Sequence, residues 1–405
     1  MINVDMPFFE RKIHKALKSH LDEKQVTILT GMRRTGKTTL VNKLLSEINS
    51  NNKIFLDFQN LANRDIFLDR DQDNIIRTLE RRGINSKLKM YVAIDEIQLV
   101  PESSGAIKYL YDHYDIKFIL TGSSSYYLKN LFSESLAGRK QIFELAPLDF
   151  GEFLTFKNVT YDSATGIDKN KNVFTESFDE HEYERLKVYY EEYVRFGGFP
   201  EVVIATSDEQ KKRLLEDILS SYINIDIKSL SDFKESTNIV NLVRMLTGRI
   251  GTRLDVMKIS RLIGMSRQTV QNYINLFEKT YLIYILPVFS NNPDREIVKA
   301  KKLYFSDTGL VSVFADVSGG SLFENAVHNQ LRVRGELAYY SLRSGKEIDF
   351  ILNKELAIEA KESPTETDRK DLEALTQKAR LNKSRLIGRN KTPKFQNYIW
   401  GGSIK

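Results

Sequence analysis

A glycine-rich stretch near the N-terminus constrains the fold of this chain more than any other feature. Residues 31–38 read GMRRTGKT and fit the pattern GxxxxGK[ST] in full. The apolar run at 26–29 predicts a short buried strand, and the apolar residues within 40–45 have helical spacing. A strand, a glycine loop and a helix in this order form a phosphate-binding loop. Glycines let backbone N–H groups curl around a phosphate, and the helix N-terminus adds partial positive charge.

Individual residues of this loop predict the ligands of a nucleoside triphosphate. The Lys37 ammonium can reach the β- and γ-phosphates, and the Thr38 hydroxyl can ligate Mg²⁺. A chance glycine turn is the alternative, but it would not carry matching strand and helix patterns on both sides. The residues expected to bind the nucleotide are Gly31, Met32, Arg33, Arg34, Thr35, Gly36, Lys37, Thr38 and Thr39.

A second motif closes the predicted strand at 89–94. It is Asp95-Glu96, two acids directly after an apolar run. Asp95 would hold the Mg²⁺ shell through water, while Glu96 would polarise the attacking water. A strand that ends in two acids is common by itself. Its position after a complete phosphate loop predicts a catalytic role.

Two further positions are candidates for the same chemistry. Another predicted strand ends in TGSS (121–124), where a hydroxyl could hydrogen-bond the γ-phosphate or the lytic water. We select Ser123, with a plain turn of Gly and Ser as the alternative. Arg139, in LAGR (136–139), could stabilise charge that develops on the γ-phosphoryl group, in its own subunit or across an interface.

The order of elements predicts an α/β fold. Strands that alternate with helices around a phosphate loop form a parallel sheet covered on both faces, here an AAA/RecA-like P-loop NTPase sheet. Glu96 directly after Asp95 and the polar strand end at 121–124 indicate the branch of these enzymes in which an extra strand separates the strands of the two motifs. A further strand is expected at 53–58 and helices at 8–22 and 64–82.

Six motifs carry a resemblance to a known family. They read GMRRTGKTT, YVAIDEIQ, FILTGSSS, LAGRK, APLDFGEFL and RFGGFPEVV. In this order they resemble the predicted AAA-type ATPases of archaea and bacteria, which usually carry a C-terminal domain of unknown function. The resemblance covers nearly the whole chain. It implies ATP as the ligand and ATP hydrolysis as the activity.

The middle of the chain is predicted to be mostly helical. A polar insert at 157–182 lacks an apolar helical period and is expected to be a loop. Gly197-Gly198-Phe199-Pro200 predicts a sharp turn, a structural joint to which we assign no chemistry. The expected helices are 147–154, 183–194 and 210–227.

The stretch at 255–278 has helix-turn-helix spacing, with Ser266 at the cap of its second helix. Predicted strands at 281–288 and 302–305 would supply a wing. Contact with DNA is one interpretation, and packing against the chain itself or a protein partner is the other. The second helix carries side chains able to read base edges or phosphates in a major groove, namely Arg267, Gln268, Gln271 and Asn272.

A third constellation lies near the C-terminus. Glu324 is on a predicted helix, Asp349 is on the middle of three predicted strands, and Glu359-Ala360-Lys361 closes the third. Because strand side chains alternate, Glu359 and Lys361 share a face, and a hairpin can place Asp349 beside them. Asp349 and Glu359 would hold Mg²⁺, and the Lys361 side chain would orient or deprotonate water. This chemistry suits metal-assisted phosphodiester hydrolysis.

This pattern resembles the active site of the PD-(D/E)xK nuclease superfamily, which includes Holliday-junction resolvases. All four positions, Glu324, Asp349, Glu359 and Lys361, are present. The helix and strand expected within 367–387 follow as that fold requires. The resemblance implies a restriction-endonuclease-like α/β domain. Nuclease folds are also retained as binding modules, so cleavage and binding without cleavage both stay open.

Composition limits the remaining choices. With 405 residues, 41% of them hydrophobic, the chain can bury more than one core. The lack of cysteine excludes disulfides and thiolate metal sites and fits a reducing cytoplasm. A net charge of +6 is compatible with nucleic acid without being diagnostic. The longest apolar stretch is about half the ~20 residues of a membrane-spanning helix, so we expect no membrane contact.

These observations predict four domains. They are a P-loop ATPase domain (1–146), a helical lid or connector (147–240), a winged helix-turn-helix (241–310) and a nuclease-like domain (311–405). The leading hypothesis is a Mg²⁺-dependent ATPase that acts on or near DNA, duplex or branched. The alternative is a nucleotide-switched regulator that binds a protein partner and cuts nothing. An oligomer is compatible with either.

Overall fold

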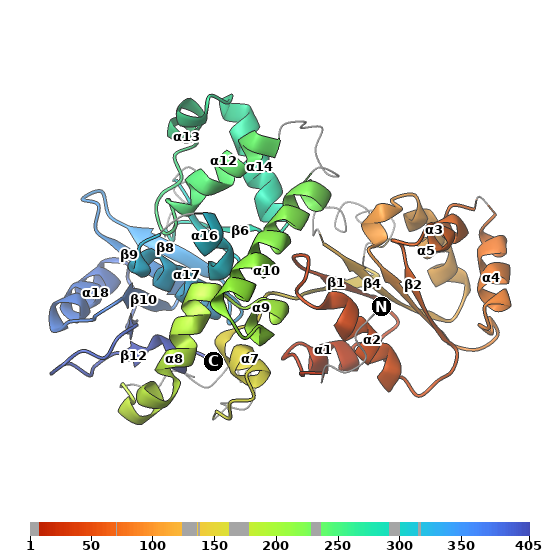
Figure 1. The fold of residues 1–405 in the computed structure, drawn as a ribbon, viewed down its shortest axis with the longest axis horizontal. Coiled ribbons are helices and arrows are strands. Elements are labelled where there is room, and N and C mark those ends of the chain that lie inside the picture. The colour runs from red at the N-terminus through yellow and green to blue at the C-terminus, as the bar shows by residue number, and fades with distance from the viewer. Residues whose placement is uncertain are drawn as a thin grey trace. The chain divides into compact units, whose positions relative to one another are not determined.

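The structure is a computed structural model, and it describes residues 8–69, 71–123, 136, 138–161, 178–227, 236–290, 300–314 and 317–405. The chain forms two compact units (Figure 1). Unit 1 comprises Met1–Ala146 and Lys279–Tyr281, and unit 2 comprises Pro147–Glu278 and Leu282–Lys405. Within the described part of the chain, every helix is too short or too polar to cross a membrane.

Unit 1 is built on a parallel sheet in the order β2-β3-β4-β1-β5. β4 lies between β1, which leads into the glycine loop, and β3, which ends in the two acids. The extra strand that the sequence predicted between the two motifs is therefore confirmed. The strands are β1 (Val26–Thr30), β2 (Lys53–Asp57), β3 (Met90–Asp95), β4 (Ile116–Gly122) and β5 (Lys140–Glu144).

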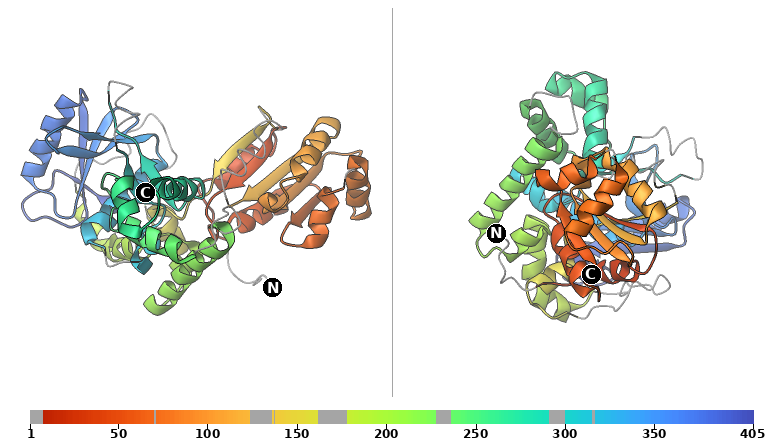
Figure 2. Two further views of the ribbon diagram at one scale, coloured as in Figure 1. Left: turned by 90° about the horizontal axis from the view of Figure 1, so that it is seen from above. Right: turned by 90° about the vertical axis from the view of Figure 1, so that its right-hand side faces the viewer.

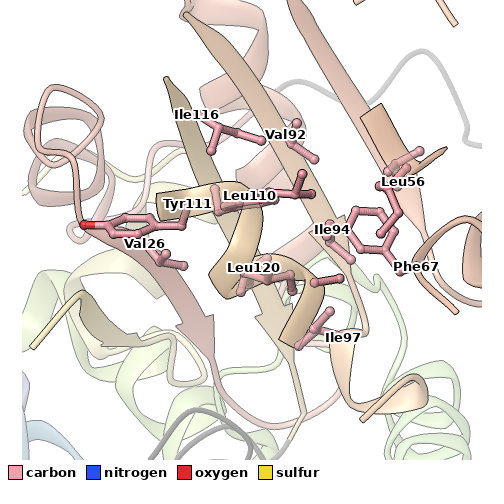
Figure 3. Close-up of a cluster of buried hydrophobic side chains, with 14 of the residues drawn as sticks. Val26, Leu56, Phe67, Val92, Ile94, Ile97, Leu110, Tyr111, Ile116 and Leu120 are labelled. Atoms are coloured by element: carbon pink, nitrogen blue, oxygen red, sulfur yellow. The ribbon is translucent and has the colours of Figure 1, made fainter. Parts of the chain in front are cut away.

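Helices cover both faces of this sheet (Figures 1 and 2). Ile94 belongs to the apolar core on one face, and Ala93, the preceding residue, belongs to the core on the other face. Strand side chains alternate, so a strand buried on both faces reads as a continuous apolar run. Figure 3 shows the first core, in which Ile94 packs with Phe67 of α3 and Leu110 of α5. The helices are α1 (His14–Ser19), α2 (Lys37–Glu47), α3 (Leu61–Phe67), α4 (Gln72–Arg81), the short 3-10 helix η1 (Ile97–Leu99) and α5 (Ser103–His113).

The helix predicted at 8–22 is shorter in the structure, where α1 covers only His14–Ser19. Lys117 of β4 explains its end. This side chain is 1% exposed, and its ammonium donates to the carbonyls of His20, Glu23 and Gln25 at 2.6, 2.8 and 2.5 Å. The segment after the helix is thus held by a tertiary contact, which the local sequence pattern does not reveal.

The first half of unit 2 is helical, as predicted. The predicted helix at 210–227 divides into α10 and a π-helical turn, and most of the predicted polar insert, 162–177, lies outside the described residues. The elements are α7 (Phe150–Phe156), α8 (Glu180–Phe196), α9 (Pro200–Ile204), α10 (Asp208–Ser221), η2 (Tyr222–Ile227), α12 (Ser236–Thr247), α13 (Val256–Ile263), α14 (Arg267–Lys279), β6 (Ile283–Leu286), β7 (Lys302–Phe305), α16 (Thr308–Phe314) and α17 (Gly319–Arg332).

The sharp turn predicted at 197–200 is present and is held by a buried carboxylate. Asp307 accepts the Gly198 N–H at 2.7 Å through Oδ2, and the N–H groups of Gly309 and Leu310 at 2.8 and 3.3 Å through Oδ1. Gly197 has a positive φ of 74°, and a Cβ there would lie 2.0 Å from Asp307 Oδ1. Only glycine fits this close approach.

The second half of unit 2 contains a mixed sheet in the order β12-β11-β10-β9-β8. β8, β9 and β10 are antiparallel neighbours, and β11 and β12 continue the sheet in parallel. The sequence predicted these strands except β12, whose two residues are too few for a periodic pattern. The strands are β8 (Leu337–Ser341), β9 (Glu347–Leu352), β10 (Leu356–Lys361), β11 (Lys383–Gly388) and β12 (Ile399–Trp400), and α18 (Glu366–Lys378) precedes β11.

Candidate functional site

The glycine loop of unit 1 lies at the carboxyl end of β1 and leads directly into α2. Gly31 is required by close approach, because a Cβ there would lie 2.2 Å from the carbonyl oxygen of Leu145. Gly36 is required by its backbone, which has a φ of 94° at the N-cap of α2. The loop and the first turn of α2, which includes the exposed Thr39, therefore present backbone N–H groups where the helix dipole is positive.

Three side chains brace this loop. The Lys37 ammonium, 5% exposed, donates to the carbonyls of Gly31 and Met32 at 2.9 and 3.0 Å. The Thr35 hydroxyl donates to the Met32 carbonyl at 2.9 Å. Arg11 donates to the carbonyls of Thr35 and Ala146 at 2.9 and 2.7 Å. Sequence reasoning missed Arg11, since nothing local to it indicates that it packs against a loop 24 residues away.

The two nucleotide motifs meet through a hydrogen bond. The Thr38 hydroxyl donates to Asp95 Oδ2 at 2.7 Å, and the Thr121 hydroxyl donates to Asp95 Oδ1. Burial raises the pKa of Asp95 above its usual range, although both hydroxyl donors oppose this shift. A hydroxyl and a carboxylate are oxygen ligands of the kind that Mg²⁺ prefers, so Thr38 and Asp95 would hold the ion together with a nucleotide.

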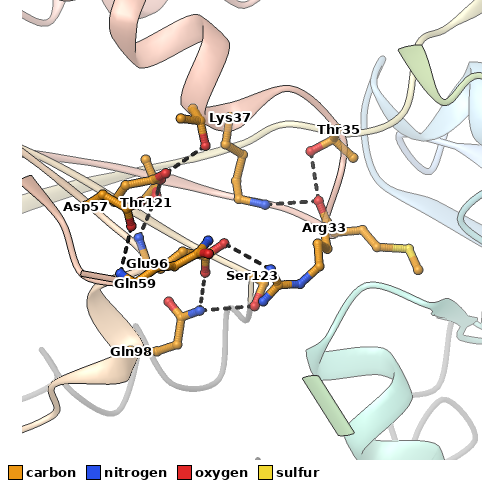
Figure 4. A network of polar contacts seen from close by, with 12 residues as sticks. Arg33, Thr35, Lys37, Asp57, Gln59, Glu96, Gln98, Thr121 and Ser123 are labelled. Carbon is orange, nitrogen blue, oxygen red and sulfur yellow. Dashed lines mark hydrogen bonds and ion pairs between the residues drawn. The ribbon is translucent and has the colours of Figure 1, made fainter. Parts of the chain in front are cut away.

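Glu96 lies beside this pair in a left-handed backbone conformation, with φ 56° and ψ 46°. Its carboxylate accepts from Gln98, its Oε1 lies 3.8 Å from Arg33 Nη1, and its backbone N–H donates to the Thr121 hydroxyl at 3.1 Å. Gln98 also donates to Ser123 Oγ at 3.2 Å (Figure 4). The structure thus places Glu96 near Arg33 and connects it through Gln98 to Ser123.

Thr121 and Gln98 complete this network, although the sequence analysis did not select them. The predicted strand end TGSS contained the signal for Thr121, because it offered several hydroxyls at one strand end. Which hydroxyl faces the acids depends on the twist and register of β4 against β3, so the sequence pattern alone could not choose. Ser124, the last residue of that motif, lies outside the described residues.

Arg139 does not lie beside the phosphate loop of its own chain. It precedes β5, and its carbonyl accepts from the N–H of Val26 at the start of β1. The loop follows the other end of β1, roughly 16 Å away for a strand of five residues. The Arg139 guanidinium pairs instead with Asp112 at 3.3 Å. The predicted role within one subunit is therefore wrong, because parallel pairing puts the two segments at opposite sheet edges. A role across an interface stays a prediction.

The helix-turn-helix residues lie on α14, which follows α13 after a turn at Gly264. The Ser266 hydroxyl accepts the Thr269 N–H at 3.0 Å, as expected of a helix cap. Arg267, Gln268 and Asn272 are exposed and Gln271 is half-buried. Gln268 donates to Asn272 at 2.9 Å, one helical turn on. The predicted residues therefore form one polar surface.

The predicted C-terminal residues also come together. Asp349 and Glu359 lie on neighbouring strands, where the Asp349 N–H donates to Glu359 Oε2 at 3.3 Å and the Ala360 N–H donates to Asp349 Oδ2 at 3.0 Å. The Lys361 ammonium lies 2.7 Å from Glu359 Oε1. Burial raises the pKa of Glu359 to about 8, and the charge of Asp349 adds to the effect. Burial likewise raises the pKa of Glu324 to about 7.

Lys302, which the sequence analysis did not select, lies among these acids. Its ammonium is 2.8 Å from Glu347 Oε1, 3.6 Å from Asp349 Oδ1 and 3.8 Å from Glu324 Oε1. Glu347, Glu324, Asp349 and Glu359 are called the carboxylate cluster below. Among the residues that the structure describes, no three His, Asp or Glu side chains are arranged to hold a metal ion.

Comparison with known proteins supports an AAA-type domain around the phosphate loop. Residues 23–154 match the family model described as AAA domain. Residues 187–320 and 319–399 match two families described as domains of unknown function, DUF8612 and DUF4143. The part of unit 1 that carries the phosphate loop and the two acids therefore matches an AAA domain. The predicted AAA resemblance is confirmed for this part of the chain, as is the expected C-terminal domain of unknown function.

Similar proteins occur in archaea and bacteria. An uncharacterized protein of Methanocaldococcus jannaschii is 27% identical, over 87% of this chain and 78% of its own length. An uncharacterized protein of Haemophilus influenzae is 26% identical, over 85% of each chain. Among solved structures, the Aeropyrum pernix ORC1 protein in complex with DNA is 12% identical, with a TM-score of 0.33 over 77% of this chain and 91% of that chain.

Proposed function

We propose that this protein binds and hydrolyses ATP in a Mg²⁺-dependent manner and acts on or near DNA through unit 2. The observation that carries the ATPase proposal is the 2.7 Å hydrogen bond from Thr38 to Asp95. It joins the two nucleotide motifs, 57 residues apart in sequence, at the carboxyl ends of β1 and β3. The next residue, Glu96, is buried within the same network.

Each residue of the site has a defined role in this proposal. The backbone N–H groups of 31–39 bind the phosphates, and Lys37 turns from the loop carbonyls toward the β- and γ-phosphates. Bound Mg²⁺ would neutralise phosphate charge. Glu96 accepts a proton from the attacking water, and Gln98 and Arg33 hold its carboxylate in place. Ser123, which accepts a hydrogen bond from Gln98, would contact the water or the γ-phosphate.

Two substitutions test the ATPase proposal. Lys37→Ala should weaken nucleotide binding, because the loop loses the charge that faces the phosphates. Glu96→Gln should bind Mg-ATP normally and hydrolyse it about 10²- to 10⁴-fold more slowly, since the amide cannot accept the proton. Lys43→Ala, a change on α2 at a residue paired with Glu47, is the control. Hydrolysis at the parent rate in both Lys37→Ala and Glu96→Gln would contradict the proposal.

The exposed surface of α14 supports the proposed contact with DNA. Arg267 would meet phosphate or a guanine edge, and the amides of Gln268 and Asn272 suit base edges. Binding of duplex or branched DNA should weaken steeply with salt, and Arg267→Ala should reduce the slope of log K against log salt by about 1. Lys346→Ala, at an exposed residue paired with Asp371, is the control. An unchanged slope and affinity in Arg267→Ala would exclude this surface.

A second candidate function is a nucleotide-switched regulator that binds a protein and has an inactive nuclease fold. The position of Lys302 among the cluster carboxylates favours it. This candidate predicts slow ATP turnover, affinity for its partner that is indifferent to salt, and no DNA cleavage. Cleavage of duplex, single-stranded or branched DNA by the parent in Mg²⁺ or Mn²⁺ would contradict this candidate. Cleavage that is lost in Asp349→Ala would assign the cluster to a nuclease.

A further inference from the structure

The carboxylate cluster already contains a cation that belongs to the chain itself. Lys302 begins β7, a strand expected to be part of the wing, whereas the acids around it come from α17 and β9. Its side chain is only 1% exposed, and the ammonium lies within 4 Å of the carboxylates of Glu324, Glu347 and Asp349. We propose that the Lys302 ammonium takes the place of a divalent metal ion in the carboxylate cluster. The domain built on the sheet of β8 to β12 is then a binding module without metal-dependent cleavage.

The carboxylate oxygens of Asp349 and Glu359 all have partners within the chain. Asp349 directs Oδ1 toward Lys302, and its Oδ2 accepts the Ala360 N–H at 3.0 Å. Glu359 pairs through Oε1 with Lys361 at 2.7 Å, and its Oε2 accepts the Asp349 N–H at 3.3 Å. A Mg²⁺ ion demands several oxygens in near-octahedral geometry. A metal ion bound to Asp349 would have to displace the Lys302 ammonium.

Glu324, the third acid expected at this site, is enclosed as well. Its Oε1 accepts the Tyr304 hydroxyl at 2.6 Å. Gly251, in the segment before α13, lies so close that a Cβ would be 2.6 Å from both carboxylate oxygens. The Gly251 N–H donates to the Leu303 carbonyl at 3.0 Å, which ties this segment to β7. The residue after Lys302 thus anchors the backbone that covers Glu324.

Charge balance agrees with a permanent role for Lys302. Arg253 Nη2 lies 3.6 Å from Glu347 Oε2, and Lys361 pairs with Glu359. Together with Lys302, three cations of the chain therefore face the four acids of the carboxylate cluster. The Tyr339 ring, whose centroid is 5.4 Å from the Lys302 ammonium, covers another side of it. An ammonium enclosed by acids and an aromatic ring is held in place and does not act as a mobile surface charge.

Titration with Mn²⁺ in the absence of nucleotide tests this inference on the full chain. Isothermal calorimetry should give the same Mn²⁺ isotherm for the parent and Asp349→Asn, because the parent cluster takes no metal. Lys302→Met should gain one site that binds Mn²⁺ at least tenfold more tightly than the parent binds it. Lys301→Met changes the exposed neighbour of Lys302 and should match the parent. A parent site that Asp349→Asn removes, or a folded Lys302→Met without the new site, would overturn the inference.

Lys302→Met also leaves three acids without their ammonium, so its folding is measured first. If it lacks a cooperative thermal transition, Lys302→Met combined with Glu347→Gln should restore one, since the nearest carboxylate no longer carries charge. A double variant as unstable as the single one would contradict the charge account. The Mn²⁺ isotherms of the parent and Asp349→Asn can be compared whether or not Lys302→Met folds. None of these measurements uses ATP or DNA, so their outcome is independent of the ATPase proposal.

Discussion

The Arg33 guanidinium of the phosphate loop lies 3.8 Å from the Glu96 carboxylate, and both side chains are largely buried. One residue belongs to the loop that would hold the phosphates, and the other would activate the water. The two halves of the proposed chemistry are thus linked by charge as well as by the bond between Thr38 and Asp95. This arrangement leads to our first prediction.

Arg33→Gln should lower kcat for ATP hydrolysis by about tenfold, because Glu96 loses a charged group that positions it. Steady-state kinetics and nucleotide binding by calorimetry measure the effect. Arg34→Gln is the matched control, since it removes the same charge from the next position of the loop. A loss of nucleotide affinity that is common to both variants reports on contact with the phosphates. If kcat falls equally in the two variants, Arg33 has no specific role toward Glu96.

Thr121→Val should destabilise unit 1 by about 1–3 kcal/mol, because the change keeps the shape but removes the hydroxyl. The Asp95 carboxylate then loses a donor, and the buried N–H of Glu96 loses its acceptor. Hydrolysis should fall as well. Urea unfolding and ATPase assays of Thr121→Val and Thr121→Ser measure both effects. Since serine keeps the hydroxyl, equal behaviour of the two variants would contradict the role assigned to Thr121.

Asp307→Asn should destabilise unit 2 by about 1–3 kcal/mol. Both oxygens of Asp307 accept backbone N–H groups, three in total, and an amide nitrogen at either position would face a donor. Urea unfolding measures the loss. Asp208→Asn, at an exposed acid paired with Arg195, should change stability by less than about 0.5 kcal/mol. A similar small effect in Asp307→Asn would show that the turn at 197–200 does not depend on this carboxylate.

The buried His328 should make unit 2 less stable in acid. Burial lowers its pKa from 6.5 to about 3, so the folded chain keeps it neutral while the unfolded chain takes up a proton below pH 6.5. Its contribution is complete above pH 6.5 and falls as the pH decreases. By pH 5 the loss should be about 2 kcal/mol.

The comparison of the parent with His328→Phe isolates this term. His328 stacks on Tyr304, with 4.4 Å between the ring centroids. Phenylalanine keeps a ring in this place but does not titrate. The raised pKa values of Glu324 and Glu359 act in the opposite direction and are common to both proteins. Urea unfolding at pH 7 and pH 5 should therefore show a smaller acid loss in His328→Phe. Equal losses in the two proteins would contradict a neutral buried His328.

Local patterns were sufficient to predict most of the elements and the grouping of the nucleotide motifs. The loop at 31–38 and the acids at 95–96 each follow an apolar strand, and parallel strands bring their carboxyl ends to one sheet edge. The same reasoning joined Asp349 with Glu359 across a hairpin, and the pairing of β9 with β10 agrees. These predictions succeeded because they need only alternation, strand direction and short connections.

Side chains contributed from distant parts of the chain could not be predicted in this way. Arg11 braces the phosphate loop, Lys117 ends α1, and Lys302 enters the carboxylate cluster, yet each is an ordinary charged residue in its local sequence. Arg139 shows the converse, since its motif suggested the phosphate site and strand direction placed it at the other sheet edge. A sequence pattern does not show which buried charge meets which partner, because that choice depends on how whole elements pack.

The sequence by itself determined that this chain has a phosphate loop, a strand ending in two acids, and a C-terminal hairpin carrying acids and a lysine. Backbone conformation and side-chain alternation are properties of neighbouring residues, so they can be read along the chain. Only the tertiary structure decided which cation lies among the C-terminal acids and which hydroxyl at the end of β4 contacts Asp95. Electrostatic contacts between buried groups depend on distances of a few ångströms, and packing sets those distances.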